Sequence, residues 1–242
     1  MNKLPFLLLL LLGGLSLAAQ GGNEDPAFAT SADLRITNTS VVYDERLDQL
    51  IFSIETAGTA GASQPTAVGG LDGAPVLGYV IPTTLAPTDV GFGETEGIVA
   101  LAMTSHPDFD DTPLWDEDND RNYANDGVIW HPHWVVLRED TRVAGGLSVR
   151  QFAPGDAVTL PPTNPGMPMY MDSPGFPVIT RGGVIRVVVP AYRMNHRTDF
   201  RFDAVTAYMQ VNGSDDSLPM LGVYTVYSVA SGDLSLPYTV SR

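Results

Sequence analysis

The chain has 242 residues, a formal net charge of −15 and no cysteine. Without cysteine, disulfides, iron–sulfur clusters and a thiolate-ligated copper centre are excluded. The acidic balance makes nucleic acid and anionic membranes unfavourable partners and makes cations favourable ones. The composition therefore indicates a protein that interacts with a metal ion and not with nucleic acid.

Residues 1–19 have the pattern of a secretory signal peptide. Lys3 gives a positive start, Phe6 to Leu12 form a short apolar run, and small residues precede a cleavage point near Ala19. The run is shorter than the ~20 apolar residues of a membrane helix, and no later segment is long enough for one. We expect a secreted, cell-surface or periplasmic protein with a flexible leader over residues 20–33 and no transmembrane segment.

Residues 34–242 are expected to form a single all-β domain, like a β-sandwich, with long irregular loops. Short apolar runs between Gly, Pro and Asp turn signals predict many strands. They comprise two segments around a turn at Asp44–Asp48, and Val76–Ile81, Gly97–Thr104, Val128–Leu137, Leu147–Phe152, Val184–Val189, Asp199–Val211 and Leu221–Ala230. The best helix candidate is short and near Leu85–Val90. Loop 153–179 carries seven prolines, which is typical of a functional loop.

The most informative stretch is VIWHPHWVVL, residues 128–137. In a strand, alternate residues share a face, so His131 and His133 are expected to lie side by side. Pro132 cannot donate to a sheet, which predicts an edge or a bulge at this point. Two neutral imidazoles in apolar surroundings each keep a nitrogen lone pair. The pair therefore predicts part of a metal site.

A third ligand is expected from His196, in a polar turn between two predicted strands. Three imidazoles can bind copper or zinc. The alternative, in which His131 and His133 only bond nearby backbone, stays open. His106, in TSHPDF, is interpreted as a surface or structural residue. Three alternating methionines offer soft thioether ligands that select copper(I), although methionine also fills gaps in a core. They are Met167, Met169 and Met171.

The loop over residues 108–126 holds eight acidic residues and one arginine. Within it, Asp116, Asp118 and Asp120 fall at alternate positions, like positions 1, 3 and 5 of a calcium loop. Arg121 and Gly127 stand where an EF-hand has its glycine and its bidentate glutamate, so the loop is not an EF-hand. We expect these three aspartates to bind calcium, and the alternative is a solvated acidic loop.

A cysteine-free, acidic, β-rich chain in which an aspartate-rich loop precedes a Trp/His strand resembles a family of copper-binding surface proteins. These proteins come from methane-oxidising bacteria and include the copper-repressible CorA type and the C-terminal part of MopE. The resemblance covers roughly residues 95–200. It implies that two histidines hold copper(I), assisted by a tryptophan oxidised to kynurenine in a Trp-x-His arrangement. It also implies bound calcium.

This sequence departs from the family pattern, because Pro132 and not histidine follows two residues after Trp130. If His133 matches the first family histidine, His131 occupies the tryptophan position. His196 then matches the second family histidine. The departure favours a three-histidine site over one that contains kynurenine, and oxidation of a neighbouring tryptophan stays open.

The sequence predicts a copper-binding protein for capture or delivery of copper, not an enzyme, with His131, His133 and His196 as ligands. An outer-membrane or periplasmic copper transporter is its expected partner. One alternative is a three-histidine zinc or copper enzyme, such as a zinc hydratase. No G-x-S-x-G or H-E-x-x-H motif supports other catalysis. The second alternative is a calcium-stabilised surface or adhesion module with structural histidines.

Overall fold

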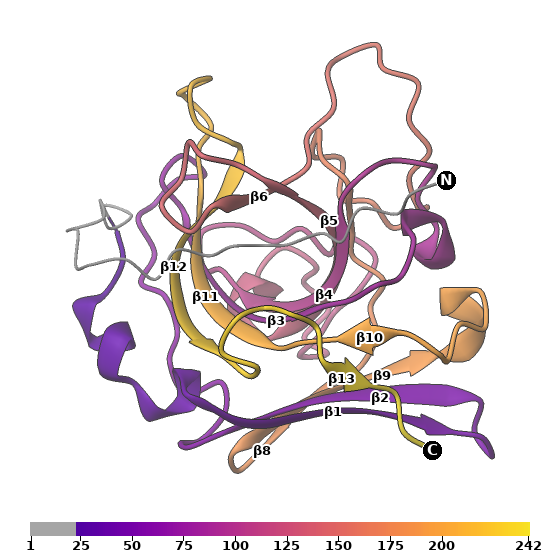
Figure 1. The fold of residues 1–242 in the computed structure, drawn as a ribbon. Coiled ribbons are helices and arrows are strands. Elements are labelled where there is room, and N and C mark those ends of the chain that lie inside the picture. The colour runs from indigo at the N-terminus through magenta and orange to yellow at the C-terminus, as the bar shows by residue number, and fades with distance from the viewer. Residues whose placement is uncertain (1–22) are drawn as a thin grey trace.

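The computed structural model describes residues 23–242, and its regular structure is almost entirely β (Figure 1). The strands pair antiparallel in two main sheets and one two-stranded ribbon. The all-β prediction is therefore confirmed. The signal peptide predicted over residues 1–19 lies outside the described residues.

The bounds of ten strands overlap the predicted segments, and those of three short strands, at residues 171–172, 178–181 and 238–239, do not. The strands are β1 (Ile36–Asp44), β2 (Gln49–Thr56), β3 (Pro75–Pro82), β4 (Ile98–Ser105), β5 (His131–Glu139), β6 (Leu147–Val149), β7 (Met171–Asp172), β8 (Val178–Arg181), β9 (Val184–Pro190), β10 (Arg201–Phe202), β11 (Val205–Val211), β12 (Leu221–Val229) and β13 (Tyr238–Thr239). The helical turns are all 3-10: η1 (Pro26–Thr30), η2 (Ala32–Leu34), η3 (Pro87–Val90), η4 (Asp126–Val128) and η5 (Ala191–Met194). Over residues 23–242, no helix has the length and apolar character needed to cross a bilayer.

Six strands form a closed sheet. Their order is β4-β3-β11-β12-β6-β5, and β5 pairs back onto β4, while β7 adds to the other side of β5. Figure 1 looks into this ring of strands. Alternate side chains point inside and pack together, among them Val80, Ala102, Val135 and Met209. The prediction of packed β layers is thus refined, because one layer curves round to close on itself.

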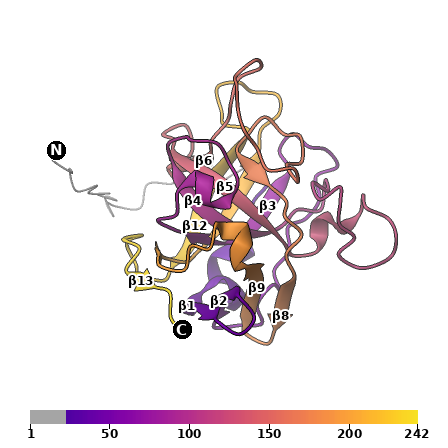
Figure 2. The same cartoon turned by 90° about the vertical axis from the view of Figure 1, so that its right-hand side faces the viewer.

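The second layer is a four-stranded sheet of order β1-β2-β9-β8. It lies beneath the closed sheet in both views (Figures 1 and 2). Its inward residues share one apolar cluster with the outward residues of β3, β4 and β5. Phe52 of β2 meets Trp134 of β5 edge to face, with ring centroids 6.0 Å apart. Burying such aromatic pairs fixes β5 from outside and leaves its other face free to carry polar groups.

The segment before β1 is not the flexible leader that its composition suggested. Phe28 is 6% exposed and belongs to the main apolar cluster. The Glu24 carboxylate accepts hydrogen bonds from Thr225 and Tyr227, and the buried Asp33 accepts one from the backbone of Ser63. The prediction is therefore wrong for residues 23–33, because one aromatic anchor and these long-range polar contacts hold the segment against the sheets.

The position of β5 explains the His-Pro-His sequence. Its register with β4 sets His131 opposite Thr104 and His133 opposite Ala102. On the other side, β7 begins to pair only at Trp134. Pro132 therefore has one neighbouring strand and not two, as a residue without an N–H requires. Both histidines point into the closed sheet, while Trp134 points to the four-stranded sheet.

Candidate metal centre

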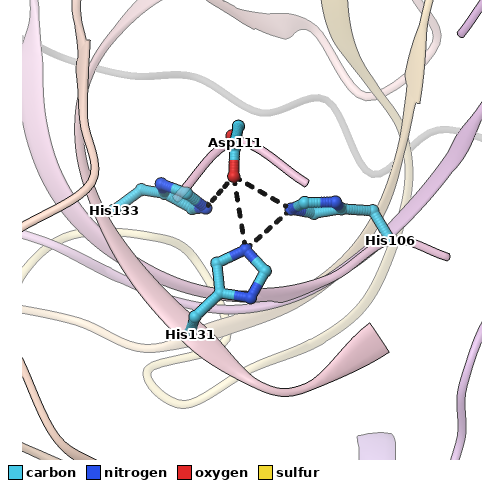
Figure 3. A group of neighbouring side chains, drawn as sticks. All are labelled: His106, Asp111, His131 and His133. Carbon is cyan, nitrogen blue, oxygen red and sulfur yellow. Dashed lines mark hydrogen bonds and ion pairs between the residues drawn. The ribbon is translucent and has the colours of Figure 1, made fainter. Parts of the chain in front are cut away.

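Three imidazoles and one carboxylate meet at one end of the closed sheet (Figure 3). His131 and His133 come from the start of β5, and His106 directly follows β4. Asp111 comes from the loop beyond it. All four side chains are buried, with exposures of 0, 1, 2 and 6% for His131, His133, His106 and Asp111. Four potential metal donors thus lie out of bulk water in one place.

The Asp111 oxygen lies at the distances from the three imidazoles that a four-coordinate metal site requires. Oδ1 of Asp111 lies 3.4 Å from Nε2 of His106, 3.4 Å from Nε2 of His131 and 3.5 Å from Nε2 of His133. Metal bonds of about 2.0–2.1 Å give a tetrahedron whose edges measure about 3.3–3.4 Å. The three distances from Asp111 therefore match a tetrahedral arrangement around a single ion.

Hydrogen bonds to the backbone fix which imidazole nitrogens face this centre. Nδ1 of His106 donates to the carbonyl of Phe109 at 2.8 Å, and Nδ1 of His131 donates to that of Ile129 at 2.5 Å. Carbonyls only accept, so in the neutral rings the proton resides on Nδ1 and the lone pair on Nε2. The two Nε2 atoms are 2.8 Å apart. When both rings are neutral, two lone pairs face each other at that distance and repel, and either a proton or a metal cation between them removes the repulsion.

Two of the donor atoms lack hydrogen bonds. Nε2 of His133 and Oδ1 of Asp111 are buried and have no hydrogen-bond partner in the described part of the chain. Leaving such groups unsatisfied costs roughly 1–3 kcal/mol each. Nδ1 of His133 lies 3.1 Å from Oγ of Ser173, which orients the ring from behind. Support of this kind, with the second nitrogen held and the first left open, is typical of histidines that bind metal.

The electrostatics keep two of the donors, Asp111 and His133, in forms that can bind a metal. Burial lowers the pKa of His133 to about 4, although the Asp111 carboxylate acts in the opposite direction. Burial also acts to lower the pKa of His106, but Asp111, the Phe109 carbonyl and Asp110 together raise that pKa above its usual value. Burial acts to raise the pKa of Asp111, yet the surrounding imidazoles hold it well below its usual range. Asp111 is therefore an anion and His133 a neutral base at neutral pH, as metal binding requires.

His196, predicted as the third ligand, does not reach this group. Its side chain is 66% exposed and its Nδ1 lies 3.7 Å from a carboxylate oxygen of Asp48. It follows η5 in a left-handed turn, with φ 55°, that faces the surface beside the start of β2. The prediction is corrected: His106 and not His196 joins the pair on β5. His106 is likewise not the surface residue that its loop context suggested.

The alternating methionines divide between two environments. Met167 and Met171 line a cavity of about 20 Å³ beside His106, Asp111 and His133. Met169 is fully buried in the interior cluster of the closed sheet. Two methionines therefore line the cavity beside the centre, and the third packs in the interior cluster.

The acidic loop forms a separate carboxylate group. Oxygens of Asp116, Asp118 and Asp126 lie within 4.8 Å of one another. Asp120 is not in this group, and its carboxylate accepts hydrogen bonds from the backbone of Asn122 and the side chain of Asn125. The predicted trio is thus corrected by replacing Asp120 with the buried Asp126. Burial and a hydrogen bond with Asp126 raise the pKa of the adjacent Glu117 to about 7.

Comparisons with known proteins add no relative. No family model, no curated protein and no solved structure matches this chain. The geometry of the buried His/Asp centre is therefore the basis for assigning a function to this chain.

Proposed function

We propose that this protein binds one copper ion through His106, Asp111, His131 and His133, and that it captures or delivers copper outside the cytoplasm. One observation carries the proposal: four buried donor atoms converge, and two of them have no hydrogen-bond partner among the described residues. Imidazole suits copper, zinc, iron and nickel, and among these divalent ions a nitrogen–oxygen site generally binds copper most tightly.

Further features support copper and a location outside the cytoplasm. Met167 and Met171 line the cavity beside the centre, and their thioethers are soft groups that favour copper(I). The signal-like pattern of residues 1–19 supports export, and the resemblance to methanotroph surface proteins supports copper. The nearby tryptophans are engaged elsewhere: Trp134 packs on Phe52, and Trp130 donates to the carbonyl of Gly61. A three-histidine site is thus favoured over a kynurenine ligand.

Metal analysis of the protein purified without chelators tests this function. We expect about one copper per chain after gel filtration, and X-ray absorption at the copper edge showing a nitrogen and oxygen shell with imidazole scattering. Zinc at the same stoichiometry, together with hydration of carbon dioxide, would instead support the three-histidine zinc enzyme. A protein with no transition metal, and none retained after titration, would end the proposal.

We also propose that Asp116, Asp118 and Asp126 bind a calcium ion that orders the acidic loop. Asp126 is fully buried, and its Oδ1 has no hydrogen-bond partner in residues 23–242. A buried carboxylate oxygen that accepts no hydrogen bond is unsatisfied, and a bound cation would satisfy it. Calcium takes six to eight oxygens, so backbone carbonyls and water would complete the shell.

Calorimetric titration with calcium checks this second site. We expect wild-type protein to bind calcium and Asp126→Asn to bind it at least about tenfold more weakly, because ligand charge sets the affinity of such sites. Asp216→Asn is the matched control, since Asp216 is exposed and distant from the loop in sequence. Equal calcium affinity in all three proteins would contradict the assignment. Circular dichroism confirms that each variant is folded.

A further inference from the structure

The cavity beside the metal centre has a defined position relative to the four donors. It measures about 20 Å³ and is bordered by His106, Asp111 and His133, but not by His131. A space bordered by three corners of a tetrahedron lies over the face that they form, opposite the fourth corner. A molecule in this cavity would therefore reach a bound metal from the side opposite His131.

The size and lining of the cavity restrict what it can hold. One water needs roughly 10–15 Å³, and organic ligands occupy pockets of about 300–1,000 Å³. A cavity of about 20 Å³ thus admits a molecule of one or two heavy atoms. Apart from the donors and Thr104, every lining side chain is apolar. These side chains are Val76, Phe109, Met167, Met171, Val211 and Leu221. Such walls favour an uncharged molecule.

One hydroxyl in the cavity has no assigned partner. Thr104 is 5% exposed, and its Oγ1 makes no hydrogen bond within residues 23–242. It lies on β4 opposite His131 and two residues before His106, and it lines the cavity. A hydroxyl can donate to an acceptor atom of a molecule bound there. In haem proteins, a hydrogen-bond donor in an otherwise apolar pocket helps to control whether dioxygen binds to the metal.

A small molecule also has a way in. Phe109 and Met167 are only partly buried, whereas the other apolar residues around the cavity are buried. The Phe109 ring stacks on His106, with centroids 4.2 Å apart and planes at 11°. These two side chains are therefore the apolar parts of the lining nearest to solvent, and Phe109 lies directly against one metal ligand.

We propose that this cavity binds a neutral diatomic molecule of the dioxygen class on the metal, opposite His131 and within reach of the Thr104 hydroxyl. The inference rests on the proposed metal site and names a ligand for it. It concerns binding alone, so no bond is made or broken within the ligand.

Carbon monoxide is the probe, because it binds copper(I) reversibly and its C–O stretch is visible in the infrared. We expect a C–O band in copper(I)-loaded wild-type protein. Val76→Leu adds one methylene to the cavity wall and should abolish the band or weaken binding at least tenfold. Val80→Leu is the control, since Val80 lies on the same face of β3 but does not line the cavity. Thr104→Val keeps the shape, and loss of its hydrogen bond should raise the stretching frequency.

The outcomes separate this proposal from the proposed function. Wild-type protein that retains copper(I) but gives no band would overturn the gas site and leave the metal site intact. A Val76→Leu variant with unchanged affinity would overturn it as well. If the protein retains iron(II) and not copper, nitric oxide and paramagnetic resonance replace carbon monoxide with the same variants. A protein that retains no metal would refute the proposed function, and the gas site with it.

Discussion

The His133→Ala variant is expected to lose stoichiometric metal binding, with an affinity at least about 100-fold below that of wild type. Removing a residue that only supports a ligand already costs about 10–100-fold, so removing a ligand should cost more. Nε2 of His133 is buried without a hydrogen-bond partner in the described residues, so its loss deprives a metal of a donor that no hydrogen bond occupies. Competition titration against a chelator of known affinity measures the effect.

Two further variants give this experiment its controls. His196→Ala removes the same side chain from an exposed position and should leave metal affinity unchanged. Ser173→Ala removes the hydroxyl behind His133 and should weaken binding by about 10–100-fold, between the other two. If His196→Ala lost the metal and His133→Ala kept it, the proposed set of four ligands would be wrong.

Metal-loaded protein is expected to melt well above the metal-free protein. A ligand that binds only the folded state at 100 times its dissociation constant adds about 2.7 kcal/mol. For a chain of this size, each kcal/mol raises the melting temperature by about 2–4 °C, so a rise of about 5–10 °C follows. The physical source is the centre itself, where the ion binds two buried donor atoms that otherwise have no hydrogen-bond partner in the described residues.

Scanning calorimetry with copper, and then with excess EDTA, measures this gain and its reversal. His133→Ala is the matched variant, and we expect no comparable rise for it at the same copper concentration. A rise of equal size in both proteins would show that copper stabilises the fold from another place. No rise in wild-type protein would show that the His/Asp group is a metal-free polar core.

Local sequence pattern predicted the half of the centre that lies on one strand. His131 and His133 share a face because strand side chains alternate, and the apolar residues around them indicated which segment would be buried. The same rule could have located His106. Ala100, Ala102 and Thr104 alternate along β4, and His106 continues that alternation beyond the last strand residue. The proline directly after His106 is typical of a loop, and this is why the sequence pattern indicated a surface or structural residue.

Other features depend on contacts between distant segments, which no local pattern encodes. Asp111 is one of eight acidic residues in its loop, and only the fold distinguishes it from the others. Closure of the sheet requires β5 to pair with β4 and, through β6, with β12. The ordered segment at residues 23–33 depends on Thr225 and Tyr227, some 200 residues away.

Gly127 connects the two proposed ion sites through the backbone. Its carbonyl accepts the backbone N–H of His106 at 2.6 Å, and a side chain on it would collide with the carbonyls of His106 and Phe109. The residue before Gly127 is Asp126, a member of the acidic group. The backbone next to that group is therefore hydrogen-bonded to the backbone of His106 in the histidine centre. If calcium binding shifts this contact and so changes copper affinity, thermodynamic reciprocity requires copper to change calcium affinity by the same factor. The pair would then respond to the joint supply of both ions.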